Sequence, residues 1–157
     1  MNIFVLSLCP LICAKQHNDK HCVKMILETA QMLCTAHHLC SDDPNQKLYK
    51  KAFENHPCSK WVRLTIGNYI WLYELFRYLC KEYTYRYFKI HMCEKKLIDL
   101  LNEIPEKIPK GNITIFPQAM PNYCKHKNPI IAYRQYYINE KSSFCTWSKR
   151  DIPYWYK

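Results

Sequence analysis

The sequence predicts a mostly α-helical protein: a single compact helical domain over residues 1–157 with a long proline-rich loop and an aromatic C-terminal tail. Apolar residues recur at helical spacing along most of the chain. A length of 157 residues is enough to bury a core without disulfides or metals. The sequence contains no internal repeat or low-complexity tract, which excludes a repeat array and a long disordered tail.

Four helical segments are predicted. The first spans about 18–38, the second begins after His56-Pro57 and continues to about 88, the third covers about 93–102, and the fourth covers about 129–140. Gly67 and Asn68 either interrupt the second segment or let another helix pack close to it. The apolar stretch 3–14 is too short to span a bilayer and has no basic leader, so we expect a buried entry segment.

Irregular structure is predicted between the third and fourth helices. Five prolines and Gly111 fall within residues 105–129. Because long loops in small domains often carry function, we expect residues 116–123 to line a binding surface. Gln118 either reads a base edge there or makes ordinary hydrogen bonds within the loop. In the tail, Trp147, Tyr154 and Trp155 are costly to expose, so we expect the tail to be docked on the domain.

A polar stripe follows one face of the first predicted helix. Its members are spaced four, three, four and three residues apart, whereas Val23, Ile26, Ala30 and Leu33 fall on the opposite face; the stripe consists of His17, His21, Lys24, Glu28 and Gln31. A carboxylate among a lysine and two imidazoles indicates a candidate site. A solvated helix face is the alternative.

The charge balance indicates a polyanionic partner. The 23 basic and 13 acidic residues give a formal charge of +10. From residue 107 onward, nine basic and two acidic residues give +7, interleaved with ten aromatic residues. Basic groups neutralise phosphates and aromatic rings stack on bases, so this pattern favours nucleic acid. A basic protein whose aromatic residues belong to the core is the alternative.

The ten cysteines are interpreted as buried free thiols in a reducing compartment. Cys22, Cys34 and Cys80 occupy positions where apolar residues are expected. Five disulfides in a secreted protein, with Asn112 as a glycosylation acceptor, are the alternative. No C-x-x-C pair occurs, which argues against a zinc site. A metal site using Cys13, His17, Asp19 or His21 remains a weaker hypothesis.

Three short motifs, in order along the chain, carry a resemblance. Asp19, His21 and Glu28 form a D-x-H-x6-E pattern, and Asn55-His56-Pro57 precedes an aromatic and basic run. Near the C-terminus, Asn139-Glu140-Lys141 is followed by Thr146-Trp147. In these motifs the chain resembles the phage pyrimidine-dimer DNA glycosylases of the endonuclease V type. The resemblance and the cysteine-rich character suit a phage or a large DNA virus as the source.

The resemblance implies a DNA glycosylase with abasic-site lyase activity that acts on damaged or modified pyrimidines. Members of that family attack the sugar with the N-terminal amine, form an imine and cut the strand by elimination. By this correspondence the catalytic residues are Met1, Glu28 and Lys141: the amine is the nucleophile, the glutamate is the acid and base, and the lysine holds phosphate. No metal or cofactor is implied. Such enzymes bend the duplex and extrude a base.

Several positions depart from the family pattern. Leu27, Gln31 and Tyr137 stand where the family has arginines. Residue 2 is Asn rather than a small residue, so we expect the initiator methionine to be retained.

We expect Glu82 and Arg86 to form an intrahelical ion pair, although Arg86 could instead face Glu28. His56 is interpreted first as a helix-entry residue and second as catalytic.

The predicted partner is DNA, preferably duplex, bound by a monomeric intracellular protein of the cytoplasm or nucleus without membrane attachment. The predicted nucleic-acid contacts are His17, His21, Lys24, Arg63, Arg86, Gln118, Lys149 and Arg150. A noncatalytic nucleic-acid-binding protein on the same scaffold is the alternative function.

Overall fold

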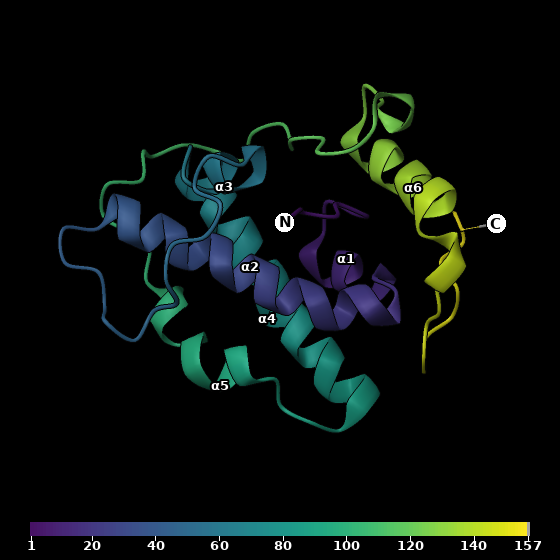
Figure 1. Ribbon diagram of the computed structural model, residues 1–157, viewed down its shortest axis with the longest axis horizontal. Helices are drawn as coiled ribbons and strands as arrows, with labels where there is room; N and C mark the ends of the chain where they lie inside the picture. Colours follow the sequence, from purple (N-terminus) through teal and green to yellow (C-terminus); the bar gives the residue numbers. More distant parts are fainter. Residues whose placement is uncertain (157) are drawn as a thin grey trace.

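Two long helices cross at the centre of the computed structural model, which describes residues 1–156. Helix α2 (Asp19–Cys40) lies across α4 (Ile66–Tyr87), and the two pack extensively on each other (Figure 1). Each starts at a capping side chain: Asn18 accepts from the backbone N–H of His21, and Thr65 accepts from that of Asn68. No strand occurs among the described residues, so the predicted mostly α class is confirmed.

The N-terminal segment threads through the core. Residues 3–6 are at most 6% exposed, and α1 (Pro10–Gln16) then packs against α4. The buried entry segment is therefore observed, but α1 was not predicted. The local signal for α1 is Pro10 at the first helical position, inside the apolar stretch.

The second predicted segment is two helices. Helix α3 (Pro57–Val62) ends before α4 begins, because Arg63 and Thr65 leave the helical conformation. The absence of a side chain at Gly67 lets another segment of the chain pack closely against the start of α4. A Cβ at this position would lie 2.5 Å from the backbone nitrogen of Ile113. The element that packs against Gly67 is thus the proline-rich loop and not a helix. Gly67 also donates its backbone N–H to the carbonyl of Gly111 at 3.0 Å.

The remaining elements surround this centre. Helix α5 (Met92–Leu97) and the short 3-10 helix η1 (Leu100–Asn102) replace the single third helix that was predicted. A second 3-10 turn, η2 (Asn122–Cys124), closes the loop before α6. Helix α6 (Pro129–Glu140) has the predicted bounds and is followed by η3 (Ser142–Phe144). In Figure 1, α6 and the C-terminal tail lie at the edge opposite the α2–α3 loop.

The tail is docked through only some of its aromatic residues. Trp147 is 8% exposed and its indole N–H donates to the carbonyl of Gln16, whereas Tyr154 is 73% exposed. Asp19 accepts hydrogen bonds from Thr146 and Ser148 and thereby ties the tail to the start of α2. Two of the matched motifs, which are far apart in sequence, therefore meet in space.

Ten cysteines are free thiols, and eight of them are buried. Burial raises the pKa of several, for example that of Cys13 to about 11, so these thiols are neutral core residues. Within residues 1–156, none of the helices combines the length and apolar character needed to cross a membrane.

Candidate active site

A small polar pocket surrounds the N-terminus, between α2, α3, α6 and the proline-rich loop. Its volume is about 230 Å³. Ten residues line it: Met1, Asn2, Phe4, His21, Lys24, Glu28, His56, Ala119, Tyr136 and Lys141. The pocket therefore brings together all three residues that the resemblance makes catalytic, and His21, Lys24 and His56 with them.

The Met1 amine and the Glu28 carboxylate form the centre of the pocket. The amine nitrogen lies 3.7 Å from Glu28 Oε2, and the backbone N–H of Asn2 donates to the same oxygen at 3.0 Å. Lys24 Nζ lies 3.3 Å from the other oxygen, Oε1. The Met1 side chain is only 1% exposed, and its sulfur accepts a hydrogen bond from Ser59. The buried side chain thus anchors the chain end and leaves the amine at the carboxylate.

The opposite wall of the pocket is aromatic and basic. The Phe4 ring lies between those of His21 and Tyr136, at centroid distances of 4.2 and 5.9 Å. Lys141 Nζ lies 4.7 Å from the centre of the Tyr136 ring, a cation–π contact that holds the ammonium at the edge of the pocket. A phosphate approaching the pocket would meet Lys24 on one side and Lys141 on the other.

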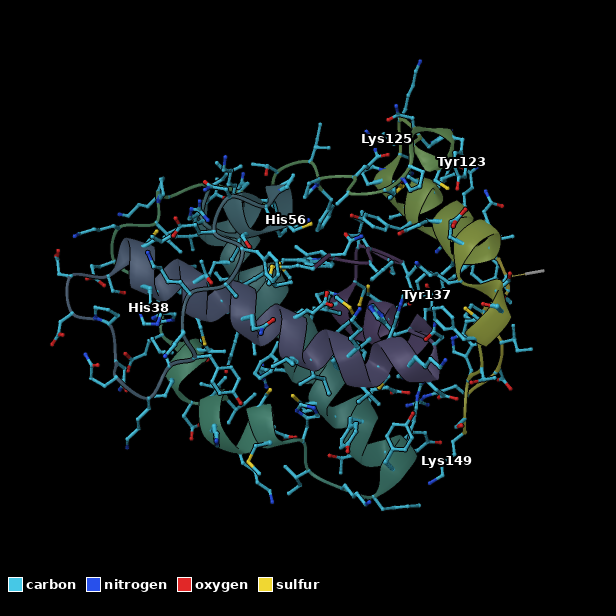
Figure 2. All side chains as sticks on the ribbon, viewed as in Figure 1. His38, His56, Tyr123, Lys125, Tyr137 and Lys149 are labelled. Atoms are coloured by element: carbon cyan, nitrogen blue, oxygen red, sulfur yellow. The ribbon has the colours of Figure 1, made fainter. Side chains whose placement is uncertain are left out.

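His56 has the structural role that was expected and also borders the pocket. Its Nδ1 accepts a hydrogen bond from the backbone N–H of Cys58 and caps α3. Burial lowers the pKa of His56, and the Met1 ammonium lowers it further, while Glu28 acts in the opposite direction. Figure 2 shows His56 beneath α3, on the side of the molecule that holds the N-terminus.

Two predicted nucleic-acid contacts are buried away from the pocket. Arg86 has no exposed side-chain surface; it pairs with Glu82 at 2.8 Å and with Asp19 at 2.9 Å, and does not face Glu28. His17 is fully buried at the end of α1, and its Nδ1 lies 2.8 Å from the carbonyl of Cys13. The polar stripe therefore begins at His21. His17 lies outside α2, so the helical spacing does not extend to it.

The other predicted contacts lie outside the pocket. Arg63 donates to the carbonyls of Ser59 and Glu54 and so holds the turn around α3. The Gln118 side-chain N–H₂ donates to the carbonyl of His126, and its Oε1 accepts from the backbone N–H of His126. Gln118 therefore makes the hydrogen bonds within the loop that were one of the two alternatives. Arg150 pairs with Glu82, and exposed Lys149 lies over the Phe88 ring at the end of α4 (Figure 2).

Three lining residues were not predicted as site residues, namely Asn2, Phe4 and Tyr136, whereas Ala119 belongs to residues 116–123, which were expected to line a binding surface. Asn2 is 7% exposed; its side chain donates to the carbonyl of Ala119 and accepts from Tyr133. These residues come from the N-terminus, the loop and α6, which meet only in the folded chain. No local pattern in the sequence predicts that these segments contact one another.

The arrangement offers no metal cluster among residues 1–156, where no group of three or more His, Cys, Asp or Glu is placed to hold an ion. Asp19 and His21 face different partners: Asp19 contacts Ser148 and Arg86, while His21 contacts Tyr137.

The fold and the pocket define a helical protein with a terminal amine held beside a glutamate, and comparison with protein families agrees. The model of the family described as pyrimidine dimer DNA glycosylase matches residues 1–96. The chain belongs to this family, and membership makes DNA its substrate class. The match includes Met1, His21, Glu28 and His56 and ends before Lys141. Searches of curated proteins and of solved structures found no match.

Proposed function

We propose that the chain is a DNA glycosylase with abasic-site lyase activity, which acts on damaged or modified pyrimidines in duplex DNA as a monomer. The observation that carries the proposal is the Met1 amine 3.7 Å from Glu28 in a pocket that also holds Lys141. A carboxylate beside an amine accepts the proton that the amine gives up when it attacks. The proposed chemistry uses no metal or cofactor.

The proposed reaction begins when the unprotonated Met1 amine attacks C1′ of the target nucleotide. The bond from C1′ to the base breaks, its electron pair leaves with the base, and the base takes up a proton. Loss of a proton from the nitrogen and opening of the sugar ring give a cationic imine, which the Glu28 carboxylate stabilises. Removal of a proton from C2′ then drives electrons toward the imine, the 3′ phosphate leaves, and water hydrolyses the remaining imine to free the Met1 amine. Glu28 is the proposed acid and base.

Binding is proposed to use the rim of the pocket. Lys24 and Lys141 flank the opening and are placed to neutralise phosphates of the strand that carries the lesion. A volume of about 230 Å³ is small, so we expect the sugar carbon to reach the amine only when the duplex is bent and the nucleotide is rotated out of the stack.

Borohydride trapping tests the proposal. The protein is incubated with duplex DNA carrying an abasic site or a cyclobutane pyrimidine dimer, borohydride is added, and adducts are separated on a denaturing gel. We expect adducts on both substrates, and their loss when the N-terminal amine is blocked. Adducts on abasic DNA alone would support the lyase and contradict the glycosylase on this lesion. Salt-sensitive binding without any adduct would favour a noncatalytic DNA-binding protein.

A further inference from the structure

His21 and Tyr137 form a hydrogen-bonded pair at the inner wall of the pocket. His21 Nδ1 lies 2.7 Å from the hydroxyl oxygen of Tyr137, although 116 residues separate them. Phe4 lies against the imidazole at a centroid distance of 4.2 Å, and Phe144 approaches at 5.7 Å. Figure 2 shows Tyr137 reaching inward from α6 toward α1 and α2. The imidazole is therefore held on several sides.

The direction of this hydrogen bond follows from the proton of the phenol. Tyr137 is fully buried, and among residues 1–156 its hydroxyl has one hydrogen-bond acceptor in reach, His21 Nδ1. A buried hydroxyl proton without an acceptor is costly, so the phenol donates and Nδ1 accepts. A neutral imidazole that accepts at Nδ1 carries its proton on Nε2.

A second buried pair shows the opposite direction. The hydroxyl oxygen of Tyr69 lies 2.7 Å from His37 Nε2 and 2.8 Å from the carbonyl oxygen of Leu101. The Leu101 carbonyl accepts the phenol proton. His37 is therefore the donor in its pair. The comparison isolates the distinguishing feature of Tyr137: no carbonyl competes for its proton within the described residues.

The charges around His21 keep its ring neutral. Burial, together with the smaller effects of His17, Lys141 and Lys24, lowers the pKa of His21 to about 3. These neighbours come from the end of α1, the end of α6 and α2 itself. With Nδ1 occupied by Tyr137, Nε2 is the nitrogen left for the pocket that the ring lines.

We propose that Tyr137 is a positioning residue that fixes His21 as the neutral Nε2–H tautomer, so that the pocket presents a hydrogen-bond donor to a sugar oxygen of the DNA strand. The identification of a sugar oxygen as the acceptor rests on the proposed function, whereas the tautomer of His21 does not. By the resemblance described above, Tyr137 stands at a position where the family pattern has an arginine. No proton is transferred in this step; the donor holds the sugar near the Met1 amine.

Nitrogen-15 NMR of the imidazole side chains tests the tautomer directly. We expect wild-type His21 to show a protonated Nε2 and an unprotonated, hydrogen-bonded Nδ1 between about pH 5 and 8, where neutral histidine tautomers are resolved. In Tyr137→Phe, the Nδ1 signal should move and both tautomers should appear. Observation of wild-type His21 with its proton on Nδ1 would overturn the proposal. This readout needs no activity, so it stands even if strand cleavage fails.

Cleavage of duplex DNA with an abasic site tests the positioning role. Tyr137→Phe should lower kcat roughly 3- to 10-fold, the size of one hydrogen bond, with KM nearly unchanged. Tyr69→Phe is the matched control, because it also deletes a buried hydroxyl bonded to a histidine, at the far end of α2. It should lower thermal stability similarly and leave kcat and the His21 signals unchanged. Equal losses of kcat in both variants would contradict the proposal.

A double substitution guards against an indirect effect on folding. In His21→Leu, both the Nδ1 acceptor for Tyr137 and the Nε2–H donor are lost. Adding Tyr137→Phe to that variant should then change kcat little, because the two residues act through one interaction. Additive losses of kcat would show that Tyr137 acts independently of His21 and would refute the positioning role.

Discussion

The Met1 amine and the Glu28 carboxylate lie 3.7 Å apart, and Lys24 approaches the same carboxylate from the solvent side. Glu28 is thus shared between a buried chain end and an exposed lysine whose side chain is 67% exposed. If Lys24 turns toward a phosphate when DNA binds, Glu28 keeps the amine as its charged partner and the Asn2 backbone N–H as its hydrogen-bond donor. This relationship sets the first prediction.

Glu28→Gln is expected to abolish strand cleavage and to leave DNA binding largely intact. The amide keeps the shape of the carboxylate but cannot take a proton or stabilise a cationic imine, so kcat should fall roughly 10²- to 10⁴-fold. Gel assays on abasic duplex DNA measure cleavage, and fluorescence anisotropy measures binding. Glu74→Gln, which alters a surface pair with Arg77 on α4, serves as the control. Unchanged cleavage in Glu28→Gln would refute the catalytic assignment.

Met1 is expected to be retained and to carry the DNA in the trapped adduct. Its side chain is 1% exposed, so removal would leave a cavity in the core beside Ser59. Mass spectrometry of the N-terminal peptide from the adduct reads the attachment site. A mature chain that starts at Asn2 would contradict this prediction and make the Asn2 nitrogen, 3.0 Å from Glu28, the nucleophile.

Lys141→Gln is expected to weaken DNA binding and to lower the slope of log affinity against log salt by about 1, the effect of one lost phosphate contact. Lys141 Nζ is held over the Tyr136 ring at the pocket edge, so its charge is in place before DNA arrives. Lys95→Gln on α5, outside the pocket, should leave the slope unchanged. Equal slopes for wild type and Lys141→Gln would show that Lys141 touches no phosphate.

The site could be predicted from sequence where its members share one helix or a known motif. His21, Lys24 and Glu28 follow one face of α2 at spacings of three and four, and that face does line the pocket. The same pattern misplaced His17, because a separate short helix ends there and His17 turns into the core. Asn2, Phe4 and Tyr136 reach the pocket through tertiary packing, which leaves no periodic trace in the sequence.

The ends of the helices could likewise be predicted where local residues mark them. Helix α6 could be bounded correctly because Asn128 and Pro129 supply a cap and a first-turn proline. An interruption of the second segment was one of two alternatives and was expected at Gly67-Asn68. The break lies at residues 63–65 instead, where Arg63 ends α3 and Thr65 caps α4, and Trp61, Leu64 and Trp71 continue an apolar pattern across it. For Arg86, the expected intrahelical ion pair with Glu82 is confirmed, whereas the burial of the side chain could not be predicted from its helix position.

Arg86→Met is therefore expected to destabilise the fold and not to act through DNA binding. Arg86 is fully buried between Glu82 and Asp19, and its loss leaves the 3% exposed Glu82 with Arg150 alone. Breaking a buried ion pair costs about 3–5 kcal/mol of unfolding free energy. Arg77→Met on the same helix removes an exposed pair and should cost about 0–1 kcal/mol. Urea unfolding measures both; similar small losses would contradict the structural role.

The buried histidines make the folded state sensitive to acid. Burial lowers the pKa of His17 from its ordinary value of 6.5 to about 4, and that of His21 to about 3. Between these values and 6.5 the unfolded chain binds more protons than the folded chain. The unfolding free energy should therefore be fully present above pH 6.5 and fall as the pH drops from 6.5 toward 4.

His17→Asn isolates the contribution of His17 to this loss. The asparagine amide can still donate to the Cys13 carbonyl that His17 Nδ1 now contacts at 2.8 Å, but it does not titrate. Urea unfolding at about pH 7.5 and about pH 4.5, on either side of the ordinary histidine pKa, should show a smaller acid loss in His17→Asn than in wild type. His126→Asn, in an exposed loop, should leave the loss unchanged. If His17→Asn lost as much stability as wild type, folding would not lower the pKa of His17. That result would contradict the burial of an uncharged His17 ring against Phe4 and Tyr137.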